Sequence, residues 1–311
     1  MTSLAILDQR ADGLFIFGEE PVRVSSGAHS GCVWNEGPVW LDAEQALLWS
    51  DIPNNRMMRW HAQEGTSVWR AAAEFTNGHA LDAHGNILHC SHGLRAIVRT
   101  VAGRGDEILV DRYKGARLNS PNDIVVKSDG TIWFTDPPYG IRSDREGHAA
   151  PSELPGNFVF RFDPASGALD VMADTVEEPN GLAFSPDESI LYVSDTAAVS
   201  RPGGGHHIVQ FHVAGDGSLG PQRPFVTIAP GVPDGFKVDS RGWVYSSSES
   251  GVQVFAEDGT PIARIDLPEK VGNLVFGGPA NDTLYICAST SIYRIRLNAR
   301  GAVAPPAPAK P

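Results

Sequence analysis

The chain has 311 residues, and its 37 acidic side chains against 25 lysines and arginines give a formal net charge of −12. Nucleic acids and anionic membrane surfaces attract concentrated positive charge, so this balance argues against both kinds of partner. Glycine and proline make up about 18% of the chain, against a usual ~12%. This excess favours many tight turns between short strands and disfavours a helical bundle.

The cysteines and the apolar runs indicate where the protein resides. Cys32, Cys90 and Cys287 are widely separated in apolar segments, which is typical of buried thiols in a reducing compartment. No apolar run approaches the ~18 residues that a membrane-spanning helix needs. The first residues lack the basic and apolar regions of a secretory signal. We therefore expect a cytoplasmic protein without membrane contact, and the sequence indicates no obligate protein partner.

Six segments of the chain share one pattern, which is a polar lead, an apolar strand, a turn and a second strand ending in small or acidic residues. In chain order the leads are NEGPVW (Asn35–Trp40), TNGHAL (Thr76–Leu81), SPNDIVV (Ser120–Val126), EPNGLAF (Glu178–Phe184), VPDGFKV (Val232–Val238) and VGNLVF (Val271–Phe276). The second strands are expected at Leu47–Asp51, Ile87–Ser91, Ile132–Asp136, Leu191–Asp195, Val244–Ser248 and Leu284–Ala288. A mean spacing of about 47 residues, with four strands per repeat, is the blade length of a β-propeller.

The repeat predicts an all-β fold, a six-bladed β-propeller with four antiparallel strands per blade in a single domain over residues 1–301. The N-terminal strand PVRVSSG (Pro21–Gly27) is expected to complete the last blade and close the ring, which hides the sheet edges. Two long insertions, Pro137–Asn157 and Thr196–His206, are expected to rim the mouth of the channel. The tail, residues 302–311, is rich in proline and alanine and is predicted to be disordered.

One aligned position recurs where the innermost strand of each blade would line the channel. Its occupants are Glu36, Asn77, Asn122, Asn180, Asp234 and Gly272. Carboxylate and amide oxygens suit a hard divalent cation, so calcium is the first expectation, while magnesium, manganese, zinc and ferrous iron stay open. The alternative is that these side chains only cap strand starts through hydrogen bonds to the backbone, because Asn-Gly and Asp-Gly also occur in plain turns.

Several motifs also resemble the gluconolactonase family, which includes regucalcin. They are EGP (Glu36–Pro38), RLNSPND (Arg117–Asp123), TDPPYG (Thr135–Gly140), PNG (Pro179–Gly181) and PDG (Pro233–Gly235). The resemblance spans Trp34 to Leu297 and implies a six-bladed propeller that hydrolyses sugar lactones with one divalent metal ion on the axis. It also implies Glu36, Asn180 and Asp234 as metal ligands, and Asn122 as a fourth ligand or a substrate contact.

The expected chemistry is attack of water on a lactone carbonyl that a metal ion polarises. The resemblance implies Asp234 as the general base. A carboxylate bound to a cation loses basicity, so Asp234 as a group that only orients the attacking water stays open. The chain has no G-x-S-x-G motif, which disfavours a serine nucleophile.

The expected substrate contacts are Asn122 together with five residues near the mouth of the channel. These are Arg117 and Asn119, which precede the inner strand of the third blade, Asp136 and Tyr139, at the end of its second strand, and His79, which alternation places on the same side as Asn77. A solvated loop role stays open for Arg117, and a role inside the channel wall stays open for His79. Asp51 and Asp195 occupy the position of Asp136 in their own blades, so all three aspartates have strand-end capping as an alternative.

Two other functions stay open. A phosphotriesterase-like hydrolase would use the same ion to polarise a P=O bond. A non-catalytic propeller that binds a metal ion or a partner would have an empty or plugged axis and no lactone turnover.

Overall fold

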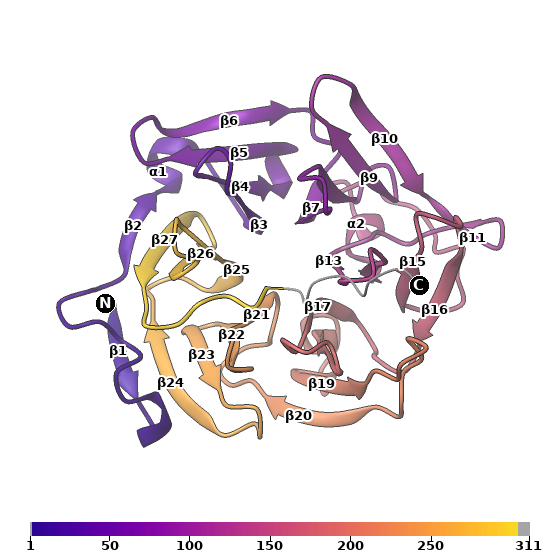
Figure 1. Cartoon of the computed structure of the whole chain (residues 1–311). Coiled ribbons are helices and arrows are strands. Elements are labelled where there is room, and N and C mark those ends of the chain that lie inside the picture. The colour runs from indigo at the N-terminus through magenta and orange to yellow at the C-terminus, as the bar shows by residue number, and fades with distance from the viewer. Residues whose placement is uncertain (1, 304–311) are drawn as a thin grey trace.

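The computed structural model describes residues 2–303 of the chain. Six antiparallel sheets of four or five strands are arranged around a central axis, and one edge strand of each sheet lies next to this axis (Figure 1). The predicted six-bladed β-propeller is therefore confirmed. Part of the predicted tail, residues 304–311, lies outside the described residues.

The first three blades follow one another in chain order. Blade 1 consists of β3 (Asn35–Leu41), β4 (Ala46–Asp51), β5 (Arg56–His61) and β6 (Gly65–Ala71). Blade 2 consists of β7 (Thr76–Leu81), β8 (Ile87–Ser91), β9 (Ala96–Val101) and β10 (Gly105–Val110). A short ribbon of β11 (Arg112–Tyr113) and β12 (Ala116–Arg117) leads to blade 3, which consists of β13 (Ile124–Val126), β14 (Ile132–Asp136), β15 (Phe158–Phe162) and β16 (Leu169–Ala173).

The last three blades include both N-terminal strands. Blade 4 consists of β17 (Pro179–Phe184), β18 (Ile190–Asp195), β19 (His207–His212) and β20 (Arg223–Thr227). Blade 5 consists of β21 (Phe236–Val238), β22 (Val244–Ser248), β23 (Gly251–Phe255), β24 (Pro261–Asp266) and β1 (Ser3–Ile6). Blade 6 consists of β25 (Val271–Gly277), β26 (Thr283–Ala288), β27 (Ser291–Arg296) and β2 (Val22–Ser25).

Helical segments are short and lie in the connections. They are the α-helices α1 (Gly27–Ser30) and α2 (Tyr139–Arg142) and the 3-10 helices η1 (Gln9–Ala11), η2 (Ile52–Asn54) and η3 (Ala197–Val199). The two predicted insertions contain α2 and η3 respectively. No helix within residues 2–303 is long and apolar enough to cross a membrane.

The N-terminal segment joins two blades that are built mainly from the end of the chain. Strand β2 pairs with β27, with Val22 opposite Arg294, so the predicted ring closure is confirmed. Strand β1 was not predicted. It pairs with β24 as a fifth, outermost strand of blade 5, with Leu4 opposite Ile265. The N-terminus therefore ties blade 5 to blade 6 and covers two sheet edges that would otherwise be exposed.

The hydrophobic core lies between neighbouring blades and not at the axis. Trp133 of β14, which is fully buried, packs edge-on against Phe184 of β17, with ring centroids 5.4 Å apart. Tyr245 of β22 meets Phe276 of β25 in the same way at 5.1 Å. Such contacts bury large aromatic surfaces and hold successive blades together. The axis itself is left to polar side chains.

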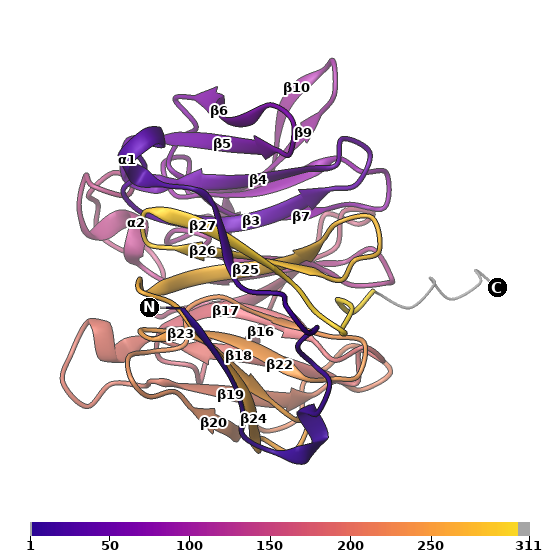
Figure 2. The same cartoon turned by 90° about the vertical axis from the view of Figure 1, so that its left-hand side faces the viewer.

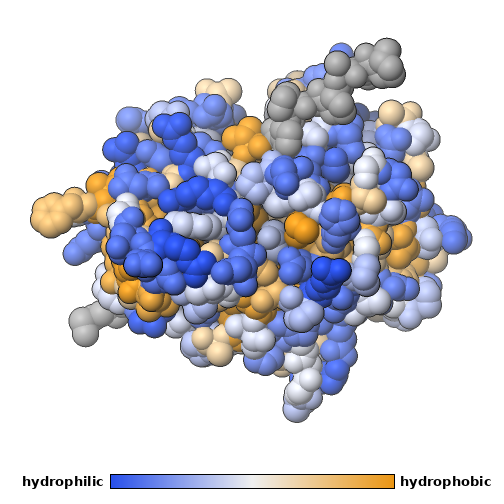
Figure 3. All heavy atoms as spheres, turned by 60° about the horizontal axis from the view of Figure 1, so that its bottom comes forward, coloured by the Kyte–Doolittle hydropathy of each residue, from blue (hydrophilic) through white to orange (hydrophobic). Residues whose placement is uncertain are grey.

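The two ends of the channel differ. The helices α1 and α2 lie at one end of the propeller, and the last described residues of the chain leave from the other end (Figure 2). At that second end the backbone N–H of Ala302 donates to the carbonyl oxygen of Val238 at 3.0 Å. Hydrophilic residues cover most of the face shown in Figure 3, where hydrophobic residues lie in scattered groups.

Candidate active site

A cavity of about 250 Å³ opens around the axis at the end where the inner strands begin. It is lined by Trp34, Glu36, Ile52, Asn77, His92, Asn122, Tyr139, Glu146, Asn180, Thr196, Val199, Val232, Asp234 and Lys270. All four predicted metal ligands, Glu36, Asn122, Asn180 and Asp234, are among these residues. The structure thus brings together four oxygen-bearing side chains from four different blades.

β-Bulges occur at the ring position, which is the aligned position held by Glu36, Asn77, Asn122, Asn180, Asp234 and Gly272. They redirect the side chains there. The strand register shifts between Glu36 and Val39 in blade 1, between Thr76 and His79 in blade 2, and between Pro179 and Leu182 in blade 4. A bulge breaks the regular alternation of side chains and re-aims one of them, which is why bulges occur next to active sites. In blades 3 and 5 the ring residue instead precedes the inner strand by two positions.

The glycine after the ring residue allows neighbouring blades to approach closely. A Cβ atom on Gly37 would lie 1.9 Å from the carbonyl oxygen of Asn77, and one on Gly181 would lie 2.5 Å from that of Asp234. Real Cβ atoms do not come so close, so only glycine fits. The Glu-Gly and Asn-Gly pairs of the leads therefore serve close packing around the axis.

Small hydroxyl side chains of the second strands hold the backbone of the ring. Ser50 donates to the carbonyl oxygen of Asn77 at 2.9 Å, Thr135 to that of Asn180 at 2.6 Å, and Ser194 to that of Asp234 at 2.8 Å. Each bond joins one blade to the next. Because these carbonyl groups lie outside the regular strand ladders, the hydroxyls satisfy groups that would otherwise be buried without partners.

The two carboxyl groups of the ring are held close together in a poorly hydrated place. Burial raises the pKa of Glu36 well above its usual value, and the charge of Asp234 raises it further. Burial raises the pKa of Asp234 to about 6, although Lys270 and the amide of Asn180 work in the opposite direction. Two such carboxylates favour a bound positive charge, because each makes ionisation of the other costly.

The donor set fits a hard divalent cation. Two carboxylates and two amides supply oxygen ligands only, and their combined charge matches that of one divalent ion. Thiolate and imidazole groups, which softer ions prefer, are not part of this four-residue set. Gly272, the sixth ring residue, leaves room for Glu36, since a Cβ atom there would lie 2.4 Å from Glu36 Oε1.

Asn77 is fixed by a histidine that sequence reasoning did not identify. Its Nδ2 lies 3.5 Å from Nε2 of His92, whose Nδ1 lies 2.8 Å from the carbonyl oxygen of Glu146. Burial lowers the pKa of His92 to about 4, so its ring is neutral at pH 7. A neutral ring that donates from Nδ1 must accept at Nε2, which directs the NH₂ group of Asn77 toward His92.

Of the other predicted substrate contacts, only Tyr139 lines the cavity. Arg117 donates to the carbonyl oxygen of Leu94 at 2.7 Å, away from the cavity. Asn119 is fully buried, and its backbone N–H donates to Oδ2 of Asp136 at 2.8 Å. Asp136 is fully buried as well, and burial raises its pKa to about 7.

The position of Asp136 corresponds to strand-end capping, the alternative that the sequence left open. The equivalent Asp51 accepts the backbone N–H of Val33 at 2.9 Å, and Asp195 accepts that of Glu178 at 3.1 Å. In each blade the aspartate thus binds backbone close to the entry of the inner strand. The three aspartates share a sequence position because they share this structural task.

His79 does not line the cavity, and the bulge explains why. The register shift between Thr76 and His79 cancels the alternation on which the expectation rested. Its Nδ1 instead lies 2.5 Å from the carbonyl oxygen of Gly37, and its ring packs edge-on against His89 with centroids 5.1 Å apart. Burial lowers the pKa of His79 to about 4.

Five further polar or aromatic lining residues come from the connections between strands. They are Trp34, His92, Glu146, Thr196 and Lys270. Lys270 lies just before β25, with its ammonium 5.2 Å from the centroid of the Trp34 ring. Thr196 and Glu146 belong to the two insertions, which were expected to rim the mouth, but nothing in the repeat pattern distinguished these residues from their neighbours.

Several known proteins are similar to this chain in sequence and in fold. Residues 34–290 match the family described as the SMP-30/Gluconolactonase/LRE-like region. A gluconolactonase of Zymomonas mobilis is 34% identical over 293 residues, which cover 86% of this chain and 80% of that protein. A solved gluconolactonase structure from Xanthomonas campestris is 39% identical, covers 94% of each chain and has a TM-score of 0.87.

More distant proteins share the fold alone. A solved structure of regucalcin from Agrobacterium tumefaciens, described as a calcium-binding protein, is 18% identical, with a TM-score of 0.72 over 89% of this chain and 94% of that one. The family match covers most of the propeller and agrees with the family resemblance predicted from the motifs. The chain belongs to the SMP-30/gluconolactonase/LRE-like family.

Proposed function

We propose that this protein hydrolyses a sugar lactone to the sugar acid, using one divalent cation held by Glu36, Asn122, Asn180 and Asp234. The observation that carries the proposal is the convergence of these four side chains on one axial cavity. The class of enzyme, a lactone-hydrolysing carboxylic ester hydrolase, is the one predicted from the sequence and the one named for the similar proteins.

Calcium is the proposed ion. Carboxylate and amide oxygens suit it, and a flexible set of side chains accommodates its variable coordination better than that of magnesium. The protein of the same fold from Agrobacterium tumefaciens is described as calcium-binding. Zinc, manganese and ferrous iron are the competitors that an experiment has to compare with calcium.

When bound, the cation supplies Lewis acidity that polarises the lactone carbonyl and stabilises negative charge in the transition state. Asp234 is the proposed acceptor of the proton of the attacking water. Without the cation, burial raises the pKa of its carboxyl group to about 6, which suits a general base near neutral pH, whereas a bound cation would lower this pKa. The alternative role of Asp234, which is to orient the attacking water, requires only that its carboxylate accept a hydrogen bond from that water.

The remaining walls suit a small polar ring. A cavity of about 250 Å³ lies just below the ~300 Å³ at which sites for drug-sized ligands begin, so a five- or six-carbon lactone is the right class of size. Asn77, Tyr139 and Lys270 offer hydrogen-bonding groups to sugar hydroxyls, and Trp34 offers an aromatic wall. The protein is also proposed to be cytoplasmic, since its three cysteines are buried and free.

The proposal is tested with metal-depleted protein, a panel of aldonolactones and a panel of divalent ions. Hydrolysis is expected to vanish on chelation, to return with calcium, and to be lost in Glu36→Gln and Asp234→Asn. Glu107→Gln removes an exposed carboxylate of blade 2 that pairs with Arg99, and serves as the matched control. Lactone turnover by the chelated protein would contradict the proposal, and preferential turnover of an organophosphate would favour the phosphotriesterase alternative.

A further inference from the structure

We propose that Thr196 is a positioning residue whose hydroxyl orients the side-chain amide of Asn180, so that Oδ1 of Asn180 faces the cation site. The inference rests on the proposed function, because it takes Asn180 to be a cation ligand. An asparagine binds a hard cation through its carbonyl oxygen, and a flipped amide would present an NH₂ group instead. Whatever fixes the orientation of this amide therefore contributes to cation affinity.

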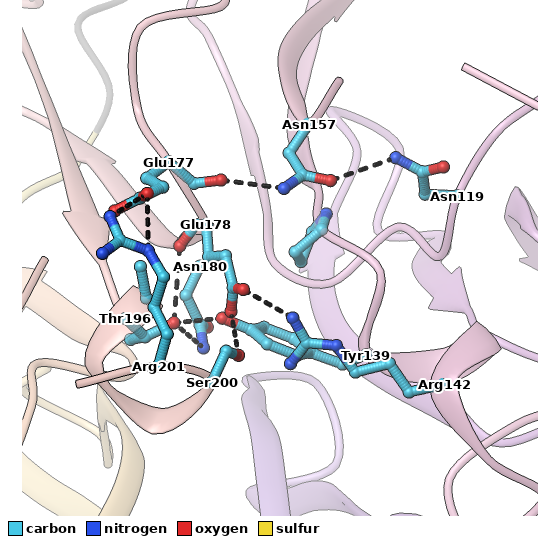
Figure 4. A network of polar contacts seen from close by, with 12 residues as sticks. Asn119, Tyr139, Arg142, Asn157, Glu177, Glu178, Asn180, Thr196, Ser200 and Arg201 are labelled. Carbon is cyan, nitrogen blue, oxygen red and sulfur yellow. Dashed lines mark hydrogen bonds and ion pairs between the residues drawn. The ribbon is translucent and has the colours of Figure 1, made fainter. Parts of the chain in front are cut away.

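The hydroxyl of Thr196 contacts three polar groups, shown in Figure 4. Its Oγ1 lies 3.5 Å from Nδ2 of Asn180 and 3.4 Å from the backbone carbonyl oxygen of Glu178, and it also contacts the phenol oxygen of Tyr139. Thr196 is 1% exposed, so water does not compete for these contacts. The hydroxyl is thus a buried junction between Asn180 and the third-blade wall of the mouth, to which Tyr139 belongs.

The bonding capacity of a hydroxyl determines which atom of the amide faces Thr196. A hydroxyl donates one hydrogen bond and accepts two. The single proton of the Thr196 hydroxyl goes to the carbonyl oxygen of Glu178 or to the phenol oxygen of Tyr139. In either case Thr196 can only accept from Asn180, so the nitrogen of the Asn180 amide, and not its oxygen, faces Thr196.

The other half of the amide is consequently free. The bond to Thr196 uses the nitrogen of the amide, so it leaves Oδ1 of Asn180 uncommitted. The oxygen therefore remains available in a cavity that already contains two carboxylates.

The two long insertions of the propeller meet at this junction. Tyr139 begins α2 in the first insertion, and Thr196 begins the second. Arg142 of α2 donates to Glu178 at 2.5 Å, and Ser200 of the second insertion donates to the same carboxylate at 2.7 Å. Since Glu178 precedes Asn180 by two residues, both insertions fix the start of β17, which contains the proposed cation ligand Asn180.

The test measures cation affinity in metal-free protein, by calorimetric titration with calcium, and not lactone turnover. Thr196→Val keeps the shape and removes the hydroxyl, and it is expected to weaken calcium binding by about 10- to 100-fold, as loss of an outer partner of a metal ligand does. Thr196→Ser is expected to restore binding to within about 3-fold. Thr175→Val is the matched control, because the Thr175 hydroxyl donates to the side chain of Gln222 on the surface, outside the axial cavity.

The outcomes separate this inference from the proposed function. Calcium binding by the wild type with equal binding by Thr196→Val would overturn the positioning role alone. No binding of calcium, zinc, manganese or ferrous iron by the wild type would overturn the proposed function and the inference with it. If Thr196→Val does not fold, Tyr139→Phe decides: calcium binding weakened several-fold supports the junction, and unchanged binding contradicts it.

Discussion

Removal of the Thr135 hydroxyl tests whether the ring is held by bonds between blades. Thr135 is fully buried, donates to the carbonyl oxygen of Asn180 at 2.6 Å and accepts the backbone N–H of Asp123 at 3.1 Å. Thr135→Val keeps the volume and leaves both backbone groups without a partner. At about 1–3 kcal/mol for each buried group left unsatisfied, the free energy of unfolding should fall by roughly 2–6 kcal/mol.

The serine variant separates the hydrogen bonds from the packing. Thr135→Ser keeps the hydroxyl and deletes one methyl group, which should cost only about 1 kcal/mol. Equilibrium unfolding in urea gives both free energies, and calcium titration reports whether the displaced Asn180 backbone also weakens the cation site. If Thr135→Ser is as destabilising as Thr135→Val, packing and not the bond between blades holds the ring, and the reasoning fails.

Three further predictions concern single positions. Gly37→Ala should lower the free energy of unfolding by roughly 2–6 kcal/mol, because its Cβ would clash with the Asn77 carbonyl oxygen and because the backbone has a positive φ of 52°. Gly85 also has a positive φ but open space around it, so Gly85→Ala should lower the free energy of unfolding by only about 1–3 kcal/mol. Asp136 binds its proton more tightly in the folded state, so the free energy of unfolding should fall by up to about 4 kcal/mol as the pH rises from 3.8 to about 7. Urea titrations at several pH values should show this fall in the wild type and not in Asp136→Asn. An equal dependence on pH in both proteins would contradict the prediction. Lys270→Gln should move the acid limb of the pH profile of kcat/KM to higher pH, because the charge of Lys270 lowers the pKa of Asp234. Lys270→Arg keeps the charge and should leave the profile in place. An unchanged profile in Lys270→Gln would contradict the effect of Lys270 on Asp234.

The fold could be predicted because the sequence contains a repeat of about 47 residues. Leads and second strands recur with strand-like composition, and the observed second strands begin within one residue of their predicted starts. Strand β1 was missed because its partner, β24, is some 260 residues away in the chain, and such pairing leaves no local signal. The family, the propeller and the class of enzyme were all predicted correctly.

The ring position could be predicted because six blades repeat it, and the rest of the cavity could not. The position of His79 depended on strict alternation, which the bulge after Thr76 removes. Asn119 precedes β13 and Asp136 ends β14, both near the mouth, but their side chains form hydrogen bonds with the backbone and do not face the cavity. The conformations of irregular connections decide which of their residues face the cavity, so Lys270 and His92 gave no signal.

The central claim is that four side-chain oxygens from four blades hold one divalent cation on the axis. Anomalous diffraction from crystals grown with manganese in place of calcium tests it most directly. The account predicts a single strong peak on the axis, with oxygens of Glu36, Asn122, Asn180 and Asp234 each at roughly 2.0–2.6 Å. An axis without a peak, or a peak ligated by other residues, would contradict it.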